Sequence, residues 1–378
     1  MAMIILMPRD SPGLPADTVS ELLPDSPELA LHIKRWGLAL GFQQIGITHI
    51  DLSTAEARLG AWLDAGLHGE LDYMARHGSK RSRPAELWPG TCRVISARMD
   101  YLNADVSAAA RSLADPERGY IARYALGRDY HKTLRQRLQK LANRITEEVQ
   151  PHSYRVFTDS APVMEKPLAE AAGLGWIGKH TNLINRNAGS CFLLGEIYTD
   201  LPLATDRPAS NHCGSCQACL DICPTQAIIA PYQLDARRCI SYFTIETRGP
   251  IPVELRAAMG NRIFGCDDCQ LVCPWNKFAR PGTESDFAVR HGLDKAGLIE
   301  LFSWTEAEWS SRTEGSALRR TGYAGWLRNI AVALGNAPSS AKVLAALQAR
   351  RDHPLELVRE HVAWALAQHE ARAAATEN

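Results

Sequence analysis

Eight of the ten cysteines in this sequence lie in one stretch, Cys213–Cys273. They form two closely spaced runs, each ending in a Cys-Pro pair, with one cysteine between the runs: Cys213, Cys216, Cys219 and Cys223, then Cys239, then Cys266, Cys269 and Cys273. Disulfide scaffolds are short and secreted, whereas clustered cysteines in a chain of 378 residues indicate metal binding or redox chemistry. The spacing therefore predicts a metal or redox module in a reduced protein.

The first run has the spacing C-x2-C-x2-C-x3-C-P, which is typical of bacterial ferredoxins with two clusters. The second run lacks one cysteine, and Cys239 can supply the missing thiolate. In such modules the fourth cysteine of each run binds the other cluster. This predicts two four-iron clusters with these ligands: Cys213, Cys216, Cys219 and Cys273 for the first, and Cys223, Cys239, Cys266 and Cys269 for the second. Two zinc sites, the alternative, would explain neither the third close cysteine nor the Cys-Pro endings.

Two clusters alone conduct electrons and perform no chemistry, so a reacting site is expected upstream. Asp129 in GRDYH and Asp159 in FTDSAP lie at the edges of predicted elements. A carboxyl group in a pocket can deliver a proton to a leaving oxygen when desolvation raises its pKa. A loop aspartate is also a common turn or helix cap, and Asp159 could cap a helix beginning near Pro162. The sequence leaves both roles open for both residues.

A basic stretch contains Asp129 and ends before Asp159. From Arg118 to Arg144 there are eight basic residues and one acid, Asp129, with three tyrosines interleaved: Tyr120, Tyr124 and Tyr130. A second basic cluster lies upstream: Arg76, Lys80, Arg81 and Arg83. One interpretation is the solvated face of an amphipathic helix. The other is a surface that holds phosphates and stacks bases, and composition does not decide between them.

The segment GLGWIG matches the dinucleotide fingerprint G-x-G-x-x-G at Gly173, Gly175 and Gly178. The fingerprint requires a strand before the glycines and a helix after them. Here the preceding EKPLAEAA predicts a helix, and no clear helix follows. We therefore interpret the glycines as a helix stop and a close backbone approach, and we expect no dinucleotide site.

The length and net charge of the chain limit the number of domains and the class of protein. A chain of 378 residues predicts two or three domains, and 46% apolar residues suffice to bury cores. Forty-two basic and forty-two acidic side chains argue against a highly charged nucleic-acid coat protein, although they exclude no local patch. The apolar run Met3–Met7 is too short for a signal sequence or a membrane span. We expect a cytoplasmic protein without membrane contact.

Hydrophobic periodicity divides the chain into four parts. Helices are predicted near 29–40, 55–64 and 134–149, and strands near 45–50, 94–101, 154–158 and 192–198. Near the C-terminus, LRNIAVALGN and VREHVAWALAQ form two similar helical segments, which suggests stacked hairpins of the HEAT type. The predicted organisation is a flexible extension (1–26), an α/β domain (27–205), a ferredoxin-like two-cluster module (206–285) and a HEAT-like helical domain (286–378).

Six segments together resemble the epoxyqueuosine reductases, the cobalamin-dependent iron–sulfur enzymes of queuosine biosynthesis in tRNA. The segments are RGYIARYALGRDYHK, FTDSAPVMEKPLAEAAGLGWIGKH, CGSCQACLDICPTQAI, RRCISYFTIETRG, GNRIFGCDDCQLVCPWN and LRNIAVALGN. The resemblance implies a cobalamin-binding α/β domain followed by the two-cluster module and the HEAT-like domain. It also implies reduction of the epoxide of epoxyqueuosine, at the wobble position of a tRNA anticodon stem-loop, to queuosine.

The resemblance assigns roles to individual residues. Asp159 matches the proton donor of the family, and Asp129 matches a second acid near the site. The cobalamin contacts of the family fall on Arg81, Asp159, Leu183, Leu194, Gln233 and Ser241. Arg248 matches a basic position placed against tRNA, and His180 departs from the asparagine common after Gly-Lys. An external electron donor and a monomeric chain are also expected.

Two other functions compete with this one. A reductive dehalogenase also pairs cobalamin with two clusters, but the basic tyrosine-containing stretch would have no purpose in it. A ferredoxin-type electron carrier with a helical docking domain would leave the whole α/β domain unexplained.

Overall fold

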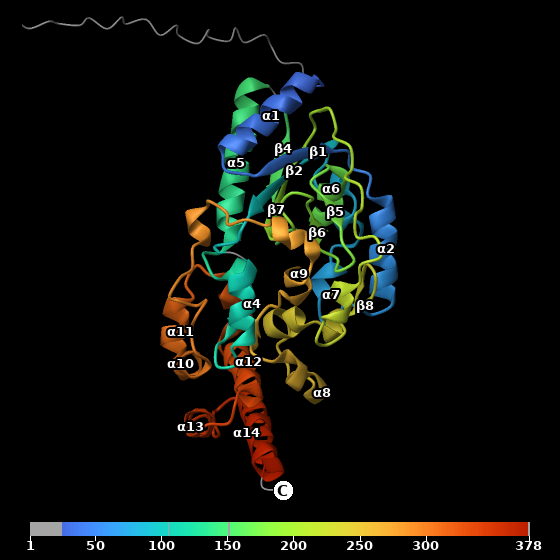
Figure 1. Ribbon diagram of the computed structural model, residues 1–378. Coiled ribbons are helices and arrows are strands. Elements are labelled where there is room, and N and C mark those ends of the chain that lie inside the picture. Colours follow the sequence, from blue (N-terminus) through green and yellow to red (C-terminus); the bar gives the residue numbers. More distant parts are fainter. Residues whose placement is uncertain (1–24, 105, 150–151, 377–378) are drawn as a thin grey trace, which may run out of the picture.

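The computed structural model describes residues 25–104, 106–149 and 152–376. The predicted flexible extension therefore lies almost entirely outside the described residues. An antiparallel sheet with helices on both faces is followed by a cysteine-rich part and then by a helical C-terminal part (Figure 1). In these ranges, no helix has the length and apolar character needed to cross a membrane.

The central sheet has the strand order β1-β2-β7-β4, and each neighbouring pair is antiparallel. Its strands are β1 Gln44–Thr48, β2 Arg93–Asp100, β7 Phe192–Thr199 and β4 Tyr154–Phe157. All four were predicted as strands from their β-branched and aromatic residues. Their antiparallel pairing could not be read from the alternation of helices and strands, which is also compatible with a parallel sheet.

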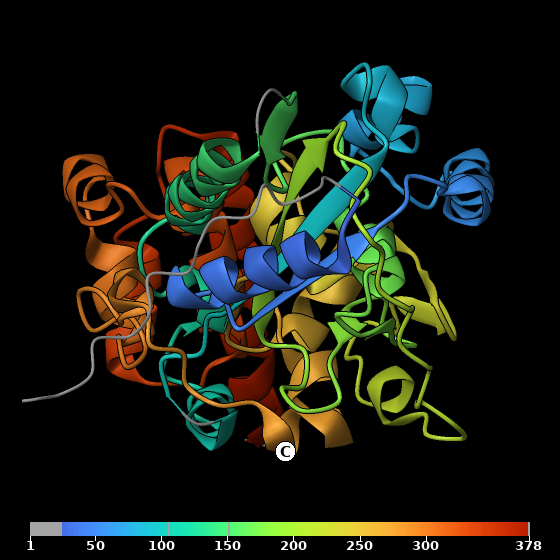
Figure 2. The same ribbon diagram turned by 90° about the horizontal axis from the view of Figure 1, so that it is seen from above.

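Successive side chains of the strands point to opposite faces, and one face carries α1 (Pro27–Ala39) and α5 (Tyr130–Glu148). The two helices lie side by side over it (Figures 1 and 2). Ile95 and Ile197 pack there against Leu138. A Cβ atom at Gly195 would lie 2.7 Å from Cδ1 of Leu138, so this glycine allows α5 to approach the sheet closely.

The opposite face carries α6 (Glu165–Ala171), whose Leu168 packs against Val94 and Tyr198. The helix ends before Gly173, which has a φ of +76°. A Cβ atom at Gly175 would lie 2.2 Å from the carbonyl oxygen of Ile184, on the short hairpin that follows. The interpretation of these glycines as a helix stop and a close backbone approach is therefore confirmed.

The remaining elements before the cysteine-rich part are short. They are α2 Ser53–Asp64, α3 Pro84–Leu87, α4 Val106–Ala114, β3 Tyr120–Ile121, β5 Trp176–Ile177 and β6 Leu183–Ile184. The strands β5 and β6 pair with each other as an antiparallel hairpin.

The cysteine-rich part consists of short elements joined by loops. They are α7 Ala218–Asp221, β8 Ile228–Ala230, β9 Gln233–Leu234, the π-helical turn Tyr242–Glu246, α8 Val253–Arg256, β10 Arg262–Phe264 and α9 Asp268–Leu271. The strand β10 pairs in parallel with β3. A strand of the N-terminal part and one of the cysteine-rich part thus share a small sheet.

The C-terminal part is helical, as predicted. Its helices are α10 Leu298–Ser303, α11 Glu306–Arg312, α12 Gly322–Asn336, α13 Ala341–Gln348 and α14 Glu356–Thr376. The two similar segments lie on α12 and α14, which pack together (Figure 1). A Cβ atom at Gly335 would lie 2.5 Å from the ring of Trp364, so the crossing is close. Ile330 of α12 also packs into a core with Ile263 of β10, which joins this part to the cysteine-rich one.

Candidate functional site

The four cysteines assigned to the first cluster surround one cavity. It has a volume of about 330 Å³ and is lined by Cys213, Cys216, Cys219 and Cys273. Burial and the neighbouring thiols raise the pKa of Cys219 to about 11. Among the described residues, no three His, Cys, Asp or Glu side chains converge as ligands of a single metal ion do. The thiols instead stand around a space, which suits a cluster held at its corners.

A lysine of the N-terminal part reaches into this ligand loop. The ammonium of Lys179 donates hydrogen bonds to the carbonyl oxygens of Gly214 and Cys216, at 2.8 Å each. Lys179 is almost fully buried and also lines the cavity. It holds the loop between the first two cysteines of the run and places a positive charge beside the thiols. No role was predicted for Lys179, although the Gly-Lys pair stands in the sequence.

The four cysteines assigned to the second cluster also lie close together. Burial raises the pKa of Cys269 well above its ordinary value, and the nearby Cys239 and Cys223 raise it further. Cys239 and Cys266 pack against one apolar cluster around Phe243 and Met259. This second group is half-buried, whereas Cys216 of the first group is exposed.

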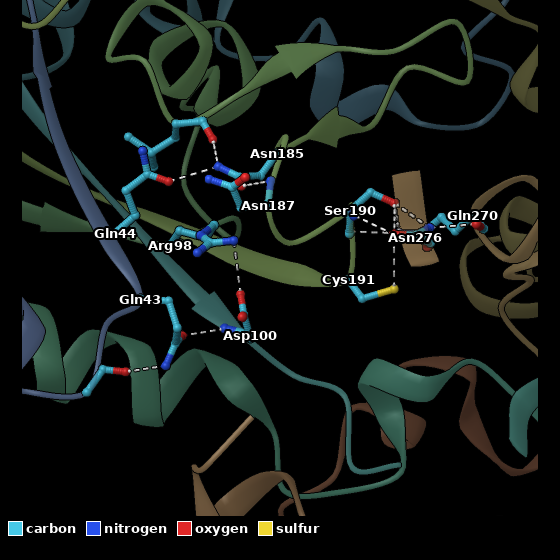
Figure 3. Close-up of polar contacts among 12 residues, drawn as sticks. Gln43, Gln44, Arg98, Asp100, Asn185, Asn187, Ser190, Cys191, Gln270 and Asn276 are labelled. Carbon is cyan, nitrogen blue, oxygen red and sulfur yellow. Dashed lines mark hydrogen bonds and ion pairs between the residues drawn. The ribbon is translucent and has the colours of Figure 1, made fainter. Parts of the chain in front are cut away.

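A polar contact fastens the cysteine-rich part to the central sheet (Figure 3). Oδ1 of Asn276, three residues after Cys273, accepts a hydrogen bond from the backbone N–H of Ser190 at 2.6 Å. Gln270 donates to the carbonyl of Ser190 at 2.9 Å. The thiol of Cys191 lies 3.9 Å from the same Asn276 oxygen. Of the two cysteines outside the runs, both of which would be expected to be buried thiols, Cys191 is buried, whereas Cys92 is partly exposed.

The two candidate aspartates are brought together by a histidine. Nδ1 of His131 lies 2.6 Å from Oδ1 of Asp129, and Nε2 of His131 contacts Oδ1 of Asp159. The hydroxyl of Tyr130 donates to the other oxygen of Asp159. Asp129 and His131 begin α5, whereas Asp159 follows β4 in the loop toward α6. A single imidazole thus connects carboxylates that are 30 residues apart in the chain.

The charges of this group depend on one another. Burial acts against a charged imidazole, but the hydrogen bonds to Asp129 and Asp159 outweigh it and raise the pKa of His131 to about 9. Burial likewise acts to raise the pKa of Asp159, but His131, then Tyr130 and the charge of Arg320, lower it below the ordinary value. At neutral pH the group therefore carries its exchangeable proton on His131, hydrogen-bonded to the Asp159 carboxylate.

The two aspartates differ in their contacts with the backbone. The side chain of Asp129 accepts a hydrogen bond from the backbone N–H of His131 at 3.1 Å, so Asp129 is the N-cap of α5 as well as a partner of the imidazole. The side chain of Asp159 contacts Tyr130 and His131. The residue preceding α6 is Met164, which makes no side-chain cap. Asp159 is therefore not a helix cap.

The interpretation of the basic stretch as a base-stacking surface is wrong for its tyrosines. Tyr120 is fully buried and Tyr130 is 8% exposed, while Tyr124 packs partly buried against two apolar cores. Several of the basic side chains pair with acids: Arg118 with Asp115, Arg128 with Asp286, Arg137 with Glu284, and Arg144 with Glu147 and Glu148. Tyrosines interleaved with basic residues are typical of a nucleic-acid surface, but here the tyrosine rings pack into the apolar cores.

The residues expected to contact cobalamin fall into three groups. Arg81 is buried, and its guanidinium donates to the carbonyls of Tyr73 and Met74 at 2.6 and 3.2 Å. Burial, then the charge of Glu246, raises the pKa of Tyr73; Arg320 acts to lower it and Asp159 to raise it, so the Arg81 loop lies near Asp159. Leu183 and Leu194 are buried together beside α6. Gln233 is exposed on β9, and Ser241 immediately precedes the π-helical turn.

Two neighbouring side chains interact with Asp159 and with the second group of cysteines. Lys166 has an exposed side chain, although burial lowers its pKa, and its charge interacts with Glu165 and with Cys269. Glu165 is partly exposed, although burial, then the charges of Glu196 and Asp159, raises its pKa well above the ordinary value. Glu165 and Lys166 thus connect the surroundings of Asp159 with those of Cys269.

Arg248 lines a larger cavity of about 690 Å³ between the cysteine-rich and helical parts. The cavity walls include Arg319, Arg320 and His353. Nη1 of Arg248 donates to the carbonyl oxygen of Thr321 at 2.8 Å. Arg320, which also pairs with Glu246 at 3.1 Å, is close enough to Asp159 to lower its pKa. A basic cavity therefore adjoins the carboxylate, which the sequence did not indicate.

Comparison with known proteins identifies the family. Residues 81–160 match the family model described as epoxyqueuosine reductase QueG, DUF1730, and residues 212–276 match the 4Fe-4S double cluster binding domain. An epoxyqueuosine reductase of Pseudomonas aeruginosa is 64% identical over 356 residues, which cover 94% of this chain and 98% of the relative. The chain belongs to the epoxyqueuosine reductases. The epoxyqueuosine reductase of Escherichia coli is 58% identical over 91% of this chain and 90% of its own.

Solved structures of epoxyqueuosine reductases have the same fold. One, determined with an epoxyqueuosine-modified tRNA-Tyr stem loop, is 29% identical, with a TM-score of 0.82 and 90% of each chain covered. Another, from Bacillus subtilis, has its aspartate catalytic loop swung out of the active site and gives a TM-score of 0.81 at 29% identity, again over 90% of each chain. The chain is therefore an oxidoreductase with a double cluster domain, and neither a dehalogenase nor a simple electron carrier.

Proposed function

We propose that this protein reduces the epoxide of epoxyqueuosine in the wobble position of a tRNA to the alkene of queuosine, with the proton supplied by the Asp159–His131 pair. The observation that carries this proposal is the imidazole of His131, held between the carboxylates of Asp129 and Asp159. An alkoxide is a poor leaving group, so a proton must reach the epoxide oxygen as the C–O bond breaks. The protonated imidazole of His131 is hydrogen-bonded to the partly exposed carboxylate of Asp159, so this pair can pass a proton to the epoxide oxygen.

The residues present fit the cofactors of the family. Thiol groups around a cavity suit the first cluster, and the half-buried second group of cysteines suits the other. Cobalamin would lie between Asp159 and Cys269, where the charge of Glu165 interacts with Asp159 and that of Lys166 interacts with Cys269. Bound there, it would supply low-valent cobalt for the reduction of the epoxide, with electrons from the clusters. The chain itself holds the proton on His131, against the carboxylate of Asp159.

The tRNA is proposed to occupy the basic cavity around Arg248, between the cysteine-rich part and the HEAT-like helices. Arginines suit phosphate because each guanidinium is permanently charged and offers several donors. Arg320 belongs both to this cavity and to the surroundings of Asp159, so an anticodon loop bound there would lie beside the acid. The relative solved with a modified stem loop supports this proposal.

Other features of the chain follow the same proposal. The domain boundaries are those expected above: the cobalamin domain over 27–205, the cluster module over 206–285 and the HEAT-like domain over 286–378. The protein acts in the cytoplasm as a monomer and receives its electrons from an external donor. The exposed Cys216 edge of the first cluster is the entry point for those electrons.

The direct test is anaerobic incubation of the purified protein with epoxyqueuosine-containing tRNA and a chemical reductant, followed by nucleoside mass analysis. The expected product lacks one oxygen atom relative to the substrate. The same incubation with tRNA that lacks the epoxide serves as the control. A substrate nucleoside that stays unchanged, in protein loaded with cobalamin and both clusters, would refute the proposed activity.

Because His131 holds the proton, we expect turnover to decrease at basic pH. Its pKa is raised to about 9, so the pair carries the proton below that pH and loses it above. Turnover should therefore be constant near neutrality and fall about tenfold per pH unit above 9. In His131→Gln this fall in turnover should begin at acidic pH, because the proton must then be held by the Asp159 carboxyl group, which ordinarily titrates there. The matched variant His152→Gln, whose imidazole contacts the Val149 carbonyl, should keep the parental profile. An unshifted fall in His131→Gln would exclude His131 as the proton carrier.

A further inference from the structure

We propose that Arg328 and Asn329 of α12 are positioning residues for the second iron–sulfur cluster, because they clamp the two backbone segments that carry its ligands Cys239 and Cys266. Both residues lie in the helical C-terminal part, and neither belongs to the cysteine runs. The inference rests on the double cluster domain and is independent of the substrate.

Arg328 is fully buried, and its guanidinium binds backbone oxygens around the π-helical turn. Nη1 donates to the carbonyls of Thr247 at 2.9 Å and of Gly249 at 2.7 Å, and Nη2 donates to the carbonyl of Phe243. Carbonyls at the end of a helix lack partners within the helix. The planar guanidinium of Arg328 thus binds Phe243, near the start of the π-helical turn, and the two residues Thr247 and Gly249 just after it.

Asn329 extends the clamp to the next strand. Its Oδ1 accepts hydrogen bonds from Nε and Nη2 of Arg328 at 3.0 and 2.9 Å, which orients both side chains. Its Nδ2 donates to the carbonyl of Thr244, in the π-helical turn, and to that of Ile263, in β10, at 2.9 Å each. One amide therefore connects the turn that follows Cys239 to the strand that precedes Cys266.

Short steps link these contacts to the cysteines. The N–H of Phe243 donates to the carbonyl of Cys239 at 3.2 Å. The hydroxyl of Thr244 accepts a hydrogen bond from the N–H of Gly265, the residue before Cys266, at 2.8 Å. All backbone partners of the clamp lie between Phe243 and Ile263, away from the ligands assigned to the first cluster. Loss of the clamp should therefore affect one cluster and spare the other.

The test measures cluster content and not turnover. Arg328→Met removes the donors and keeps an apolar stem, while Asn329→Asp keeps the shape and the acceptor for Arg328 but turns oxygens toward two carbonyls. After anaerobic reconstitution, both variants should hold about four irons per chain where the parent holds about eight. Their reduced electron paramagnetic resonance spectra should show one isolated cluster in place of two interacting ones.

The matched control is Arg256→Met. Arg256 is also fully buried, and its guanidinium donates to the carbonyl of Ile251 and to the carboxylate of Glu360, which belong neither to the π-helical turn nor to β10. This variant should lose thermal stability and yet keep about eight irons. The proposal is overturned if Asn329→Asp and any folded Arg328→Met keep the full iron content and the parental spectrum. It is also overturned if the irons lost come from both clusters equally, or if Arg256→Met loses the second cluster as well. A parent without eight irons would refute the ligand assignment instead.

Discussion

The Asp159→Asn variant is expected to bind cobalamin and both clusters and yet to turn over about 10²–10⁴ times more slowly than the parent, the usual contribution of a positioned acid or base. The amide has the shape of the carboxyl group and still accepts a hydrogen bond from Tyr130. It cannot pass a proton from His131 to a leaving oxygen. Single-turnover rates under anaerobic conditions measure the loss, and the absorbance of cobalamin and clusters shows that the cofactors are in place.

Asp115→Asn is the matched control for this variant. The side chain of Asp115 is 36% exposed against 35% for Asp159, and it too pairs with a basic side chain, Arg118 at 2.8 Å. It should retain the parental rate. Full activity in Asp159→Asn would remove this residue as the acid, whereas a variant that no longer binds cobalamin would assign it to cofactor binding alone.

The Cys239→Ala variant should hold about four irons where the parent holds about eight, because one cubane loses a ligand and the other keeps all four. Turnover should fall below detection, because Lys166 and Glu165 connect Cys269 of the second group to the surroundings of Asp159. Iron and sulfide analysis measures the first effect, and product formation with a chemical reductant measures the second.

Cys191→Ala provides the comparison for Cys239→Ala. Cys191 is a buried thiol that contacts Asn276 and belongs to neither ligand set. This variant should keep about eight irons and most of its activity. An unchanged iron content in Cys239→Ala would show that another group supplies the fourth ligand of the second cluster.

Features that depend on local spacing could be predicted from the sequence. The cysteine sets follow from short intervals along the chain, and the strands Arg93–Asp100 and Phe192–Thr199 follow from their β-branched residues. The antiparallel order of the sheet was out of reach, because strand pairing depends on which faces become buried together. The N-cap at Asp129 was foreseen only as one of two alternatives.

The contact between His131 and Asp159 could not be predicted from the sequence. His131 stands two residues from Asp129, but its role depends on Asp159, which is 28 residues away in the chain and reaches it through the packing of β4 against α5. Arg320 and Lys179 act over still longer separations, through contacts with Glu246 and with the carbonyl of Cys216. Neither contact has a local pattern that a single sequence could display.

The pairing of β3 with β10 has a consequence for biosynthesis. Tyr120 lies opposite Arg262, so the partner of β3 leaves the ribosome about 140 residues later, after the whole of the first cysteine run. Until then the Tyr120 hydroxyl also lacks its buried acceptor, Asp267. Closing so long a loop is slow relative to local structure formation. The nascent chain therefore completes this small sheet, and the burial of Tyr120 within it, only after the first cysteine run has been translated.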